Sequence, residues 1–241
     1  MLGNTGIAKF LKIEKLVDSI KWEVQIFLNK KENKKRSTEK IFIIGLNKTG
    51  TTSIEKAFKT HKYKTGQQKF FEYLTLSYLK RKNPKRIMKY VQYYDAFQDI
   101  PFFLEGIYSS IFEKFPKSKF ILSVRDSEQQ WYKSFVNYYS IVCQLEKGKM
   151  LEMSDFKKCG YVYKGFLYEV FTDFFGTTSL DEDILKNKYK EHNENVISFF
   201  KDQPDRLLVI NVAKEGSYRK FCDFIGKEAN SDSFEWLNKN S

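Results

Sequence analysis

The residues with the clearest chemical meaning form a short stretch rich in glycine and hydroxyl groups, Gly45-Leu46-Asn47-Lys48-Thr49-Gly50-Thr51-Thr52-Ser53. The stretch follows four apolar residues, 41–44, and runs into a segment, 53–59, whose composition suits a helix. Between a strand and a helix, backbone N–H groups and the helix dipole together form an anion site. Hydroxyl groups add further hydrogen-bond donors here, from Thr49, Thr51, Thr52 and Ser53. The stretch therefore predicts a phosphate-binding loop.

The lysine of this loop is displaced relative to loops that bind nucleoside triphosphates. Gly45 and Gly50 have the spacing of such a loop, but Thr51 stands where its lysine should be, and Lys48 precedes the second glycine. In the triphosphate loop the lysine reaches the β- and γ-phosphates, and the next Ser or Thr holds magnesium. The displacement argues against ATP or GTP hydrolysis, while the loop still favours an anion.

A second strand-to-helix junction carries an arginine. Arg125 follows the apolar segment 119–124, and Ser134 lies in a helical segment, 128–139. An arginine and a hydroxyl group can form a fork for a second phosphate, which a nucleoside 3′,5′-bisphosphate has and ATP lacks. Ligands of open α/β sheets lie beyond the carboxyl ends of the strands, so Arg125 is expected to contact the ligand. A structural salt bridge of Arg125 with Asp126 or Glu128 is the alternative.

The two junctions together resemble the phosphate-binding elements of sulfotransferases that use 3′-phosphoadenosine 5′-phosphosulfate (PAPS). Residues 48–53 resemble the 5′-phosphosulfate-binding loop of that family, and residues 120–134 resemble its 3′-phosphate-binding element. Residues 189–193 and 206–226 are similar to the C-terminal part of a mainly bacterial and marine branch of the family. Arg125 and Ser134 are one residue further apart than is usual in the family, so another donor in place of Ser134 remains open.

The resemblance implies a sulfuryl transfer from PAPS to a hydroxyl or amino group of a glycan or small molecule, without a metal ion. Lys48 would stabilise the leaving oxygen and the sulfonate, and residues 49–53 would hold the 5′-phosphate. Lys214 and Gly216 follow the last predicted strand. By resemblance they contact the 3′-phosphate or the adenine, and the alternative is an ordinary strand-to-helix turn.

Asp99 is the first choice for the general base that takes the acceptor proton. It ends a strand-like segment just before Pro101, and its place resembles that of the catalytic histidine or carboxylate in many sulfotransferases. The alternative is that Asp99 caps the helix that begins after Pro101.

Glu72 is the second choice for the base. Its segment is similar to the region where glycan sulfotransferases place a catalytic glutamate, although the nearest positions, Gln67 and Gln68, cannot act as bases. His61 is expected at a surface turn, and His192 is expected to make a structural hydrogen bond in a long polar helix.

Apolar periodicity predicts the elements that position these residues. The expected strands are 41–44, 91–97, 119–124 and 206–212, and the expected helices are 53–59, 102–115, 128–139, 182–201 and 216–225. Strands alternating with helices indicate a three-layer α/β fold with a central, mostly parallel sheet. We expect one such domain at 41–241.

Two segments fall outside this pattern. The pattern of residues 1–40 predicts an amphipathic helix at 7–28 followed by a charged linker. The helix is expected to pack on the outside of the domain, and the alternative is a helix that binds a membrane surface or a partner. Residues from about 140 to 180 predict an insertion or lid that shapes the acceptor pocket, although their rings suit a helical core equally. These rings are Tyr138, Tyr139, Tyr161, Tyr163, Phe166, Tyr168, Phe171, Phe174 and Phe175.

Composition excludes some classes of protein but does not choose a ligand. The 241 residues are 41% hydrophobic and carry a net charge of +12, which attracts polyanions of any kind. No apolar stretch is long enough for a membrane span or a signal peptide. Cys143, Cys159 and Cys222 show no disulfide or metal-ligand spacing, so a reducing, cytoplasmic location is expected. The alternative functions are a P-loop kinase or nucleotide-binding protein and a basic nucleic-acid-binding module; the aromatic residues lie mostly at core spacings, which disfavours the latter.

Overall fold

The structure is a computed structural model that describes residue 24, residues 39–146 and residues 149–235. The chain divides into one unit at Met1–Arg36 and another at Ser37–Ser241. Apart from residue 24, the predicted helix at 7–28 lies outside the described residues.

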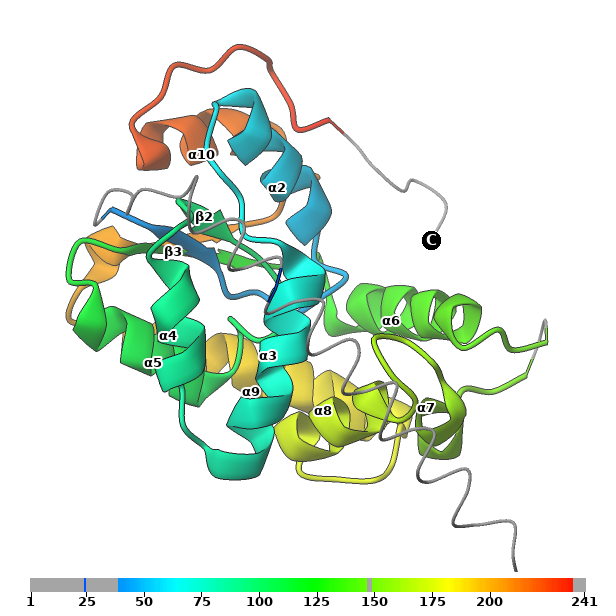
Figure 1. Ribbon diagram of the computed structural model, residues 1–241. Coiled ribbons are helices and arrows are strands. Elements are labelled where there is room, and N and C mark those ends of the chain that lie inside the picture. Colours follow the sequence, from blue (N-terminus) through cyan, green and yellow to red (C-terminus); the bar gives the residue numbers. More distant parts are fainter. Residues whose placement is uncertain (1–23, 25–38, 147–148, 236–241) are drawn as a thin grey trace, which may run out of the picture. The chain divides into compact units, whose positions relative to one another are not determined.

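Four parallel strands form one sheet in the order β2-β1-β3-β4 (Figure 1). The strands are β1 (Ile41–Ile43), β2 (Ala96–Phe97), β3 (Lys119–Ser123) and β4 (Leu207–Ile210). In this register Phe42 of β1 lies beside Phe97 on one side and Phe120 on the other. Because β1 and β3 are parallel neighbours, the loops that follow them leave the same edge of the sheet together. Ligands of such folds bind at this edge.

Helices connect and cover the strands (Figure 1). They are α2 (Thr51–Thr60), α3 (Gln68–Arg81), α4 (Lys85–Val91), α5 (Glu105–Lys114), α6 (Glu128–Val142), α7 (Met153–Lys158), α8 (Phe166–Phe175), α9 (Glu182–Phe199) and α10 (Ser217–Ile225), with a 3₁₀ turn at Pro204–Arg206. The predicted three-layer α/β fold with a parallel sheet is confirmed.

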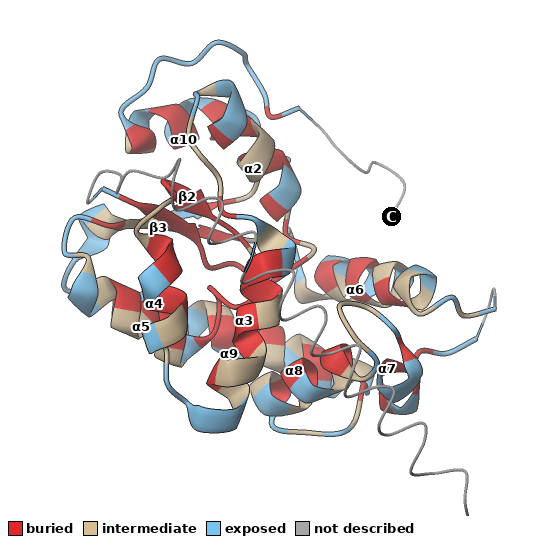
Figure 2. Cartoon of the chain, viewed as in Figure 1, coloured by how far each residue is buried: buried red, intermediate tan, exposed pale blue. Residues whose placement is uncertain are grey.

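The two faces of the sheet have different cores, because side chains along a strand point alternately to opposite faces. Ile41 and Ile43 of β1 belong to a cluster with Phe58 of α2 and Phe221 of α10. Phe42 points to the other face and joins an aromatic cluster completed by Phe71, Phe97, Phe102, Phe112, Phe120, Phe199 and Phe200. Figure 2 shows the strands buried between these helical layers.

The structure corrects three predictions about secondary structure. The expected strand at 91–97 is only the two residues of β2, because Val91 ends α4, where it is buried beside Ile87 and Met88. The sequence predicted no helix within residues 140–180, whereas the structure forms α7 and α8 there. Helix α3 was not predicted, and it carries part of the site described next.

Candidate active site

The loop after β1 requires glycine at both ends. A Cβ atom on Gly45 would lie 2.3 Å from the backbone oxygen of Ser123 on β3, so a side chain there would push the two strands apart. Gly50 has φ 96°, a left-handed conformation that glycine adopts without strain, and it is the N-cap of α2. Gly50 has no side chain to cap the first turn, and the Ser53 N–H donates to the Gly50 carbonyl at 3.1 Å, so the N–H groups of Thr51 and Thr52 are the ones available to an anion.

Hydrogen bonds to Ser123, Trp131 and Tyr139 hold the loop after β1 in place. The Thr49 hydroxyl donates to the Leu46 carbonyl at 2.5 Å and hydrogen-bonds the Ser123 hydroxyl at 2.6 Å. The indole N–H of Trp131 donates to the Asn47 carbonyl at 3.0 Å, and the Asn47 amide hydrogen-bonds the Tyr139 hydroxyl. Thr49 is fully buried, so its hydroxyl stabilises the loop and does not face a ligand.

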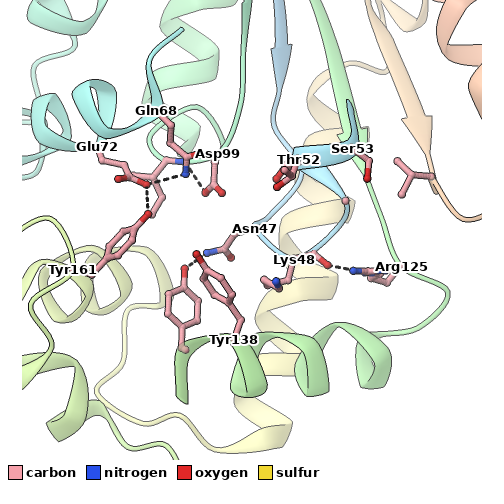
Figure 3. A pocket seen from close by; sticks show the side chains of 15 residues that line it. Asn47, Lys48, Thr52, Ser53, Gln68, Glu72, Asp99, Arg125, Tyr138 and Tyr161 are labelled. Carbon is pink, nitrogen blue, oxygen red and sulfur yellow. Dashed lines mark hydrogen bonds between the residues drawn. The ribbon is translucent and has the colours of Figure 1, made fainter. Parts of the chain in front are cut away.

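A cavity of about 190 Å³ opens beside this loop (Figure 3). It brings together the loop, Arg125 and Asp99, as the sequence predicted. The lining residues are Asn47, Lys48, Gly50, Thr51, Thr52, Ser53, Gln68, Glu72, Asp99, Ile100, Arg125, Tyr138, Tyr139, Tyr161 and Val212.

Arg125 connects the loop after β1 to the junction between β3 and α6. Its Nε–H donates to the Lys48 carbonyl at 2.6 Å, and its backbone N–H donates to the Tyr189 hydroxyl at 2.8 Å. Burial lowers the pKa of Arg125. Asp126 pairs with Lys214 at 2.6 Å, and Glu128 pairs with Lys190 at 3.8 Å. The predicted alternative of a structural salt bridge therefore does not describe Arg125.

Lys48 and Arg125 are the two positively charged residues that line the cavity. Its Nζ lies 4.0 Å from the centroid of the Tyr138 ring, a cation–π contact. Burial lowers the pKa of Lys48, the positive charge of Arg125 lowers it further, and Asp99 opposes the change. Lys48 therefore lies within electrostatic reach of both Arg125 and Asp99.

Asp99 lies at the opposite, acidic end. Its Oδ1 accepts a hydrogen bond from the Ile100 N–H at 2.8 Å. Helix α5 begins only at Glu105, with Leu104 as its N-cap, so Asp99 does not cap it. Burial raises the pKa of Asp99 to about 6, against the opposing effects of the Ile100 N–H, Lys48 and Gln68. This value suits a group that accepts a proton near neutral pH.

Glu72 lies beside Asp99 and is only 1% exposed. Its Oε1 accepts from the Gln68 amide at 2.9 Å and from the Tyr161 hydroxyl at 2.8 Å. Burial raises the pKa of Glu72 to about 7, and the negative charge of Asp99 adds to this effect. The acidic end thus holds two carboxyl groups.

The remaining predicted phosphate contacts lie outside the cavity lining. Ser134 on α6 is 7% exposed, and its hydroxyl has no hydrogen-bond partner in the described part of the chain. Lys214 is exposed and paired with Asp126. Gly216 has φ 70° and is the N-cap of α10, so the turn explains this glycine.

Both histidines lie outside the cavity lining. His192 is buried, and its Nε2 contacts the Ile44 carbonyl at 2.8 Å, which confirms the predicted structural hydrogen bond. Burial lowers its pKa to about 4. His61 is the C-cap of α2 and lies 3.1 Å from the Tyr218 hydroxyl.

The aromatic residues of 138–175 divide between the two predicted roles. Tyr138, Tyr139 and Tyr161 line the cavity, whereas Phe166, Phe171 and Phe175 are buried core.

Sequence reasoning did not find the role of Gln68. Gln68 and Glu72 lie one turn apart on α3, as residues i and i+4 on one face of a helix do. Recognition of this helix from the apolar positions Phe70, Phe71 and Leu74 would have placed both polar groups together.

A family model described as a sulfotransferase domain matches residues 40–241. No curated protein was found that matches the chain. None of the described helices combines the length and apolar character that a membrane-spanning helix needs.

Proposed function

The chain belongs to the sulfotransferase domain family, and on this premise we propose that it transfers a sulfuryl group from PAPS to a hydroxyl or amino group of an acceptor. The observation that carries the proposal is the polarity of one cavity, which has Lys48 and Arg125 at one end and Asp99 at the other. A sulfuryl transfer needs positive charge at the donor and a proton acceptor at the incoming nucleophile.

The donor end fits an anion with phosphate groups. Backbone N–H groups at the start of α2 and the hydroxyls of Thr51, Thr52 and Ser53 suit a 5′-phosphate. The guanidinium of Arg125 keeps terminal N–H groups besides the one bound to Lys48, and these suit a second phosphate. The displaced lysine, at position 48 and not 51, favours this donor over ATP.

The acceptor end supplies the base. Asp99 takes the proton as the acceptor oxygen or nitrogen forms its bond to sulfur, and the bond from sulfur to the 5′-phosphate oxygen breaks. Lys48 stabilises the negative charge that develops on that leaving oxygen. The products are the sulfated acceptor and 3′-phosphoadenosine 5′-phosphate (PAP). This scheme assigns no role to a metal ion.

The first test is calorimetric titration of the full chain with PAP, ATP and AMP. We expect PAP to bind more tightly than AMP and ATP, and Lys48→Ala to weaken PAP binding, whereas Lys80→Ala on the surface of α3 should not. ATP binding as tight as PAP binding would favour the kinase alternative and reject the proposal.

The second test separates donor binding from chemistry. Asp99→Asn keeps the size of the side chain but cannot take a proton. In an acceptor screen with PAPS, we expect this variant to lose turnover while its affinity for PAP stays within about threefold of the parent. Retained turnover would reject Asp99 as the base and return that role to Glu72.

A further inference from the structure

Cys143 and Cys159 lie together at the ends of two helices. Cys143 is the C-cap of α6, and Cys159 is the C-cap of α7. The Cys159 Sγ lies 3.7 Å from the carbonyl oxygen of Val142, the residue before Cys143. The Cys143 thiol also hydrogen-bonds the Cys159 thiol. The two sulfur atoms are therefore neighbours in space, although the spacing of the two residues in the sequence predicted no pair.

The third cysteine of the chain lies elsewhere. Cys222 is fully buried on α10, in the core cluster that also contains Phe58 of α2. Its Sγ lies 3.5 Å from the Nε2 of His61. Cys143 and Cys159 are therefore the two cysteines that are placed to react with each other within one chain.

The two thiols differ in their access to solvent. Cys143 is half-buried, so a small molecule can reach its sulfur, whereas Cys159 is only 5% exposed. Burial raises the pKa of Cys143, and the neighbouring Cys159 and Asp155 add to this effect, so the thiol is protonated at neutral pH and reacts slowly. An oxidant would attack Cys143 first, and Cys159 would then react with the modified Cys143.

The cysteine pair lies next to two tyrosines that line the cavity. The Cys143 N–H donates to the Tyr139 carbonyl at 2.9 Å, one helical turn earlier on α6. Tyr161 follows Cys159 by two positions, and its hydroxyl donates to Glu72. A covalent bond between the two sulfur atoms would join the backbone segments that carry Tyr139 and Tyr161.

We propose that Cys143 and Cys159 form a reversible disulfide when the chain meets a small disulfide compound such as oxidised glutathione. The Cys143 thiolate attacks one sulfur of the oxidant, so that a mixed disulfide forms and one glutathione leaves. The Cys159 thiolate then attacks the Cys143 sulfur, and the second glutathione leaves. Two protein thiols are oxidised, the glutathione disulfide is reduced to two thiols, and each leaving thiolate takes up the proton that the attacking thiol lost. This inference does not depend on the proposed function.

Peptide mapping of the full chain tests the bond directly. The chain is incubated with oxidised glutathione at pH 8, its free thiols are blocked with N-ethylmaleimide in denaturant, and tryptic peptides are identified by mass spectrometry. We expect the peptides of Cys143 and Cys159 to be joined in at least half of the chains, with Cys222 blocked as a free thiol. Dithiothreitol should return both thiols.

Melting temperature tests whether the bond ties α6 to α7. A cross-link restricts the unfolded chain, so the oxidised parent should melt about 5 °C or more above the reduced parent. Cys143→Ser is the matched variant and should show no such rise after the same treatment. Cys222→Ser keeps the pair and should respond as the parent does. If a variant fails to fold, the peptide map of the parent still decides.

Four results would overturn the inference. They are blocking of both Cys143 and Cys159 as free thiols after oxidation, a mixed disulfide with glutathione that persists at Cys143, a disulfide between two chains on a non-reducing gel, and an unchanged melting temperature of the cross-linked chain. The first three reject the bond within one chain, and the last rejects its effect on the two helices.

Discussion

Arg125→Lys separates two contributions that the single guanidinium of Arg125 would make to the binding of PAPS or PAP in the proposed function. The Nε–H of Arg125 holds the carbonyl of Lys48 at 2.6 Å, which fixes the loop, while its terminal N–H groups are directed to a second phosphate in the proposed complex. Lysine keeps the positive charge but carries one compact ammonium group in place of a planar fork. The variant therefore keeps a phosphate contact and loses the contact that holds the loop.

The size of each loss follows from the kind of hydrogen bond. A hydrogen bond to a charged group contributes roughly 1.5–3 kcal/mol, and we take the lower end because Arg125 is only half-buried and partly screened by solvent. A loss of about 1.5 kcal/mol corresponds to roughly a tenfold weaker affinity. We expect Arg125→Lys to weaken PAP binding about tenfold, and Arg125→Ala, which loses both contacts, to weaken it about 150-fold.

Titration calorimetry with PAP and AMP measures how the binding free energy divides between the loop contact and the contact with the second phosphate. AMP lacks the 3′-phosphate, so its affinity should fall about tenfold in both variants, by the loop contribution alone. Arg81→Ala, at the exposed end of α3, makes the same change in net charge and should leave both affinities unchanged. The reasoning is refuted if Arg125→Lys binds PAP as tightly as the parent, or if Arg125→Ala weakens AMP as much as PAP.

Three further predictions concern pH and packing. With Asp99 as the base and a pKa of about 6, kcat/KM should rise about tenfold per pH unit below pH 6 and level off above it; a flat profile from pH 5 to 8 would contradict this assignment. The pKa of Glu72 is raised from 4.5 to about 7, so the folded state binds that proton more tightly than the unfolded state does. This carboxyl therefore stabilises the fold at low pH, and the contribution, about 3 kcal/mol, is lost as pH rises from about 4.5 through 7; urea unfolding should show this loss in the parent relative to Glu72→Gln. Gly45→Ala should lower the free energy of unfolding by about 1–3 kcal/mol, because its Cβ would lie 2.3 Å from the Ser123 oxygen. Gly160 has open space around it, so Gly160→Ala should leave the stability unchanged. Thermal melts of both variants and the parent measure the difference.

The strand, loop and helix at the positively charged end of the cavity were predictable because their signals are local. An apolar run, two glycines and the following hydroxyls lie within thirteen residues, 41–53, and they specify a strand, a turn and a helix start without knowledge of the rest of the chain. Arg125 was found in the same way, from the apolar strand before it. The structure places both junctions at one edge of the sheet because β1 and β3 are neighbours.

The edge strand β2 and the aromatic segment 140–180 were predicted less well, because their sequence patterns fit more than one kind of secondary structure. Ile87, Met88, Tyr90 and Val91 are all buried in α4, which ends at Val91, and residues 92–95 form a turn before the two-residue strand β2. Rings at 166, 171 and 175 lie on the buried side of α8, a short helix between Gly165 and Gly176. A segment that is dense in aromatic residues and has glycines at both ends is compatible with either a lid or a core helix, so the sequence pattern could not distinguish the two.

The acidic end depends on contacts between residues far apart in the chain, which local patterns cannot specify. The Tyr161 hydroxyl reaches Glu72 across 89 positions, and Gln98 reaches Gln68 across 30. Each of these side chains would be read alone as an ordinary polar residue of a helix or loop. Their common role follows only from the packing of α3 against the loop that carries Asp99.

Six residues other than glycine have a positive φ in the described part of the chain, and two of them, Lys48 and Asp99, line the cavity; the others are Lys62, Lys82, Gln144 and Val162. Lys48 and Asp99 have φ of 72° and 60°, a left-handed conformation that costs a residue with a side chain roughly 1–2 kcal/mol and glycine almost nothing. Each cost is offset by a contact at that position: Arg125 binds the Lys48 carbonyl, and the Ile100 N–H binds the Asp99 carboxyl. Glycine would meet the backbone requirement at lower cost but would remove the cation and the carboxylate from the two ends of the cavity. In the proposed function these two residues lie on opposite sides of the space where the transferred group would pass, and their conformation is one that functional residues are known to adopt.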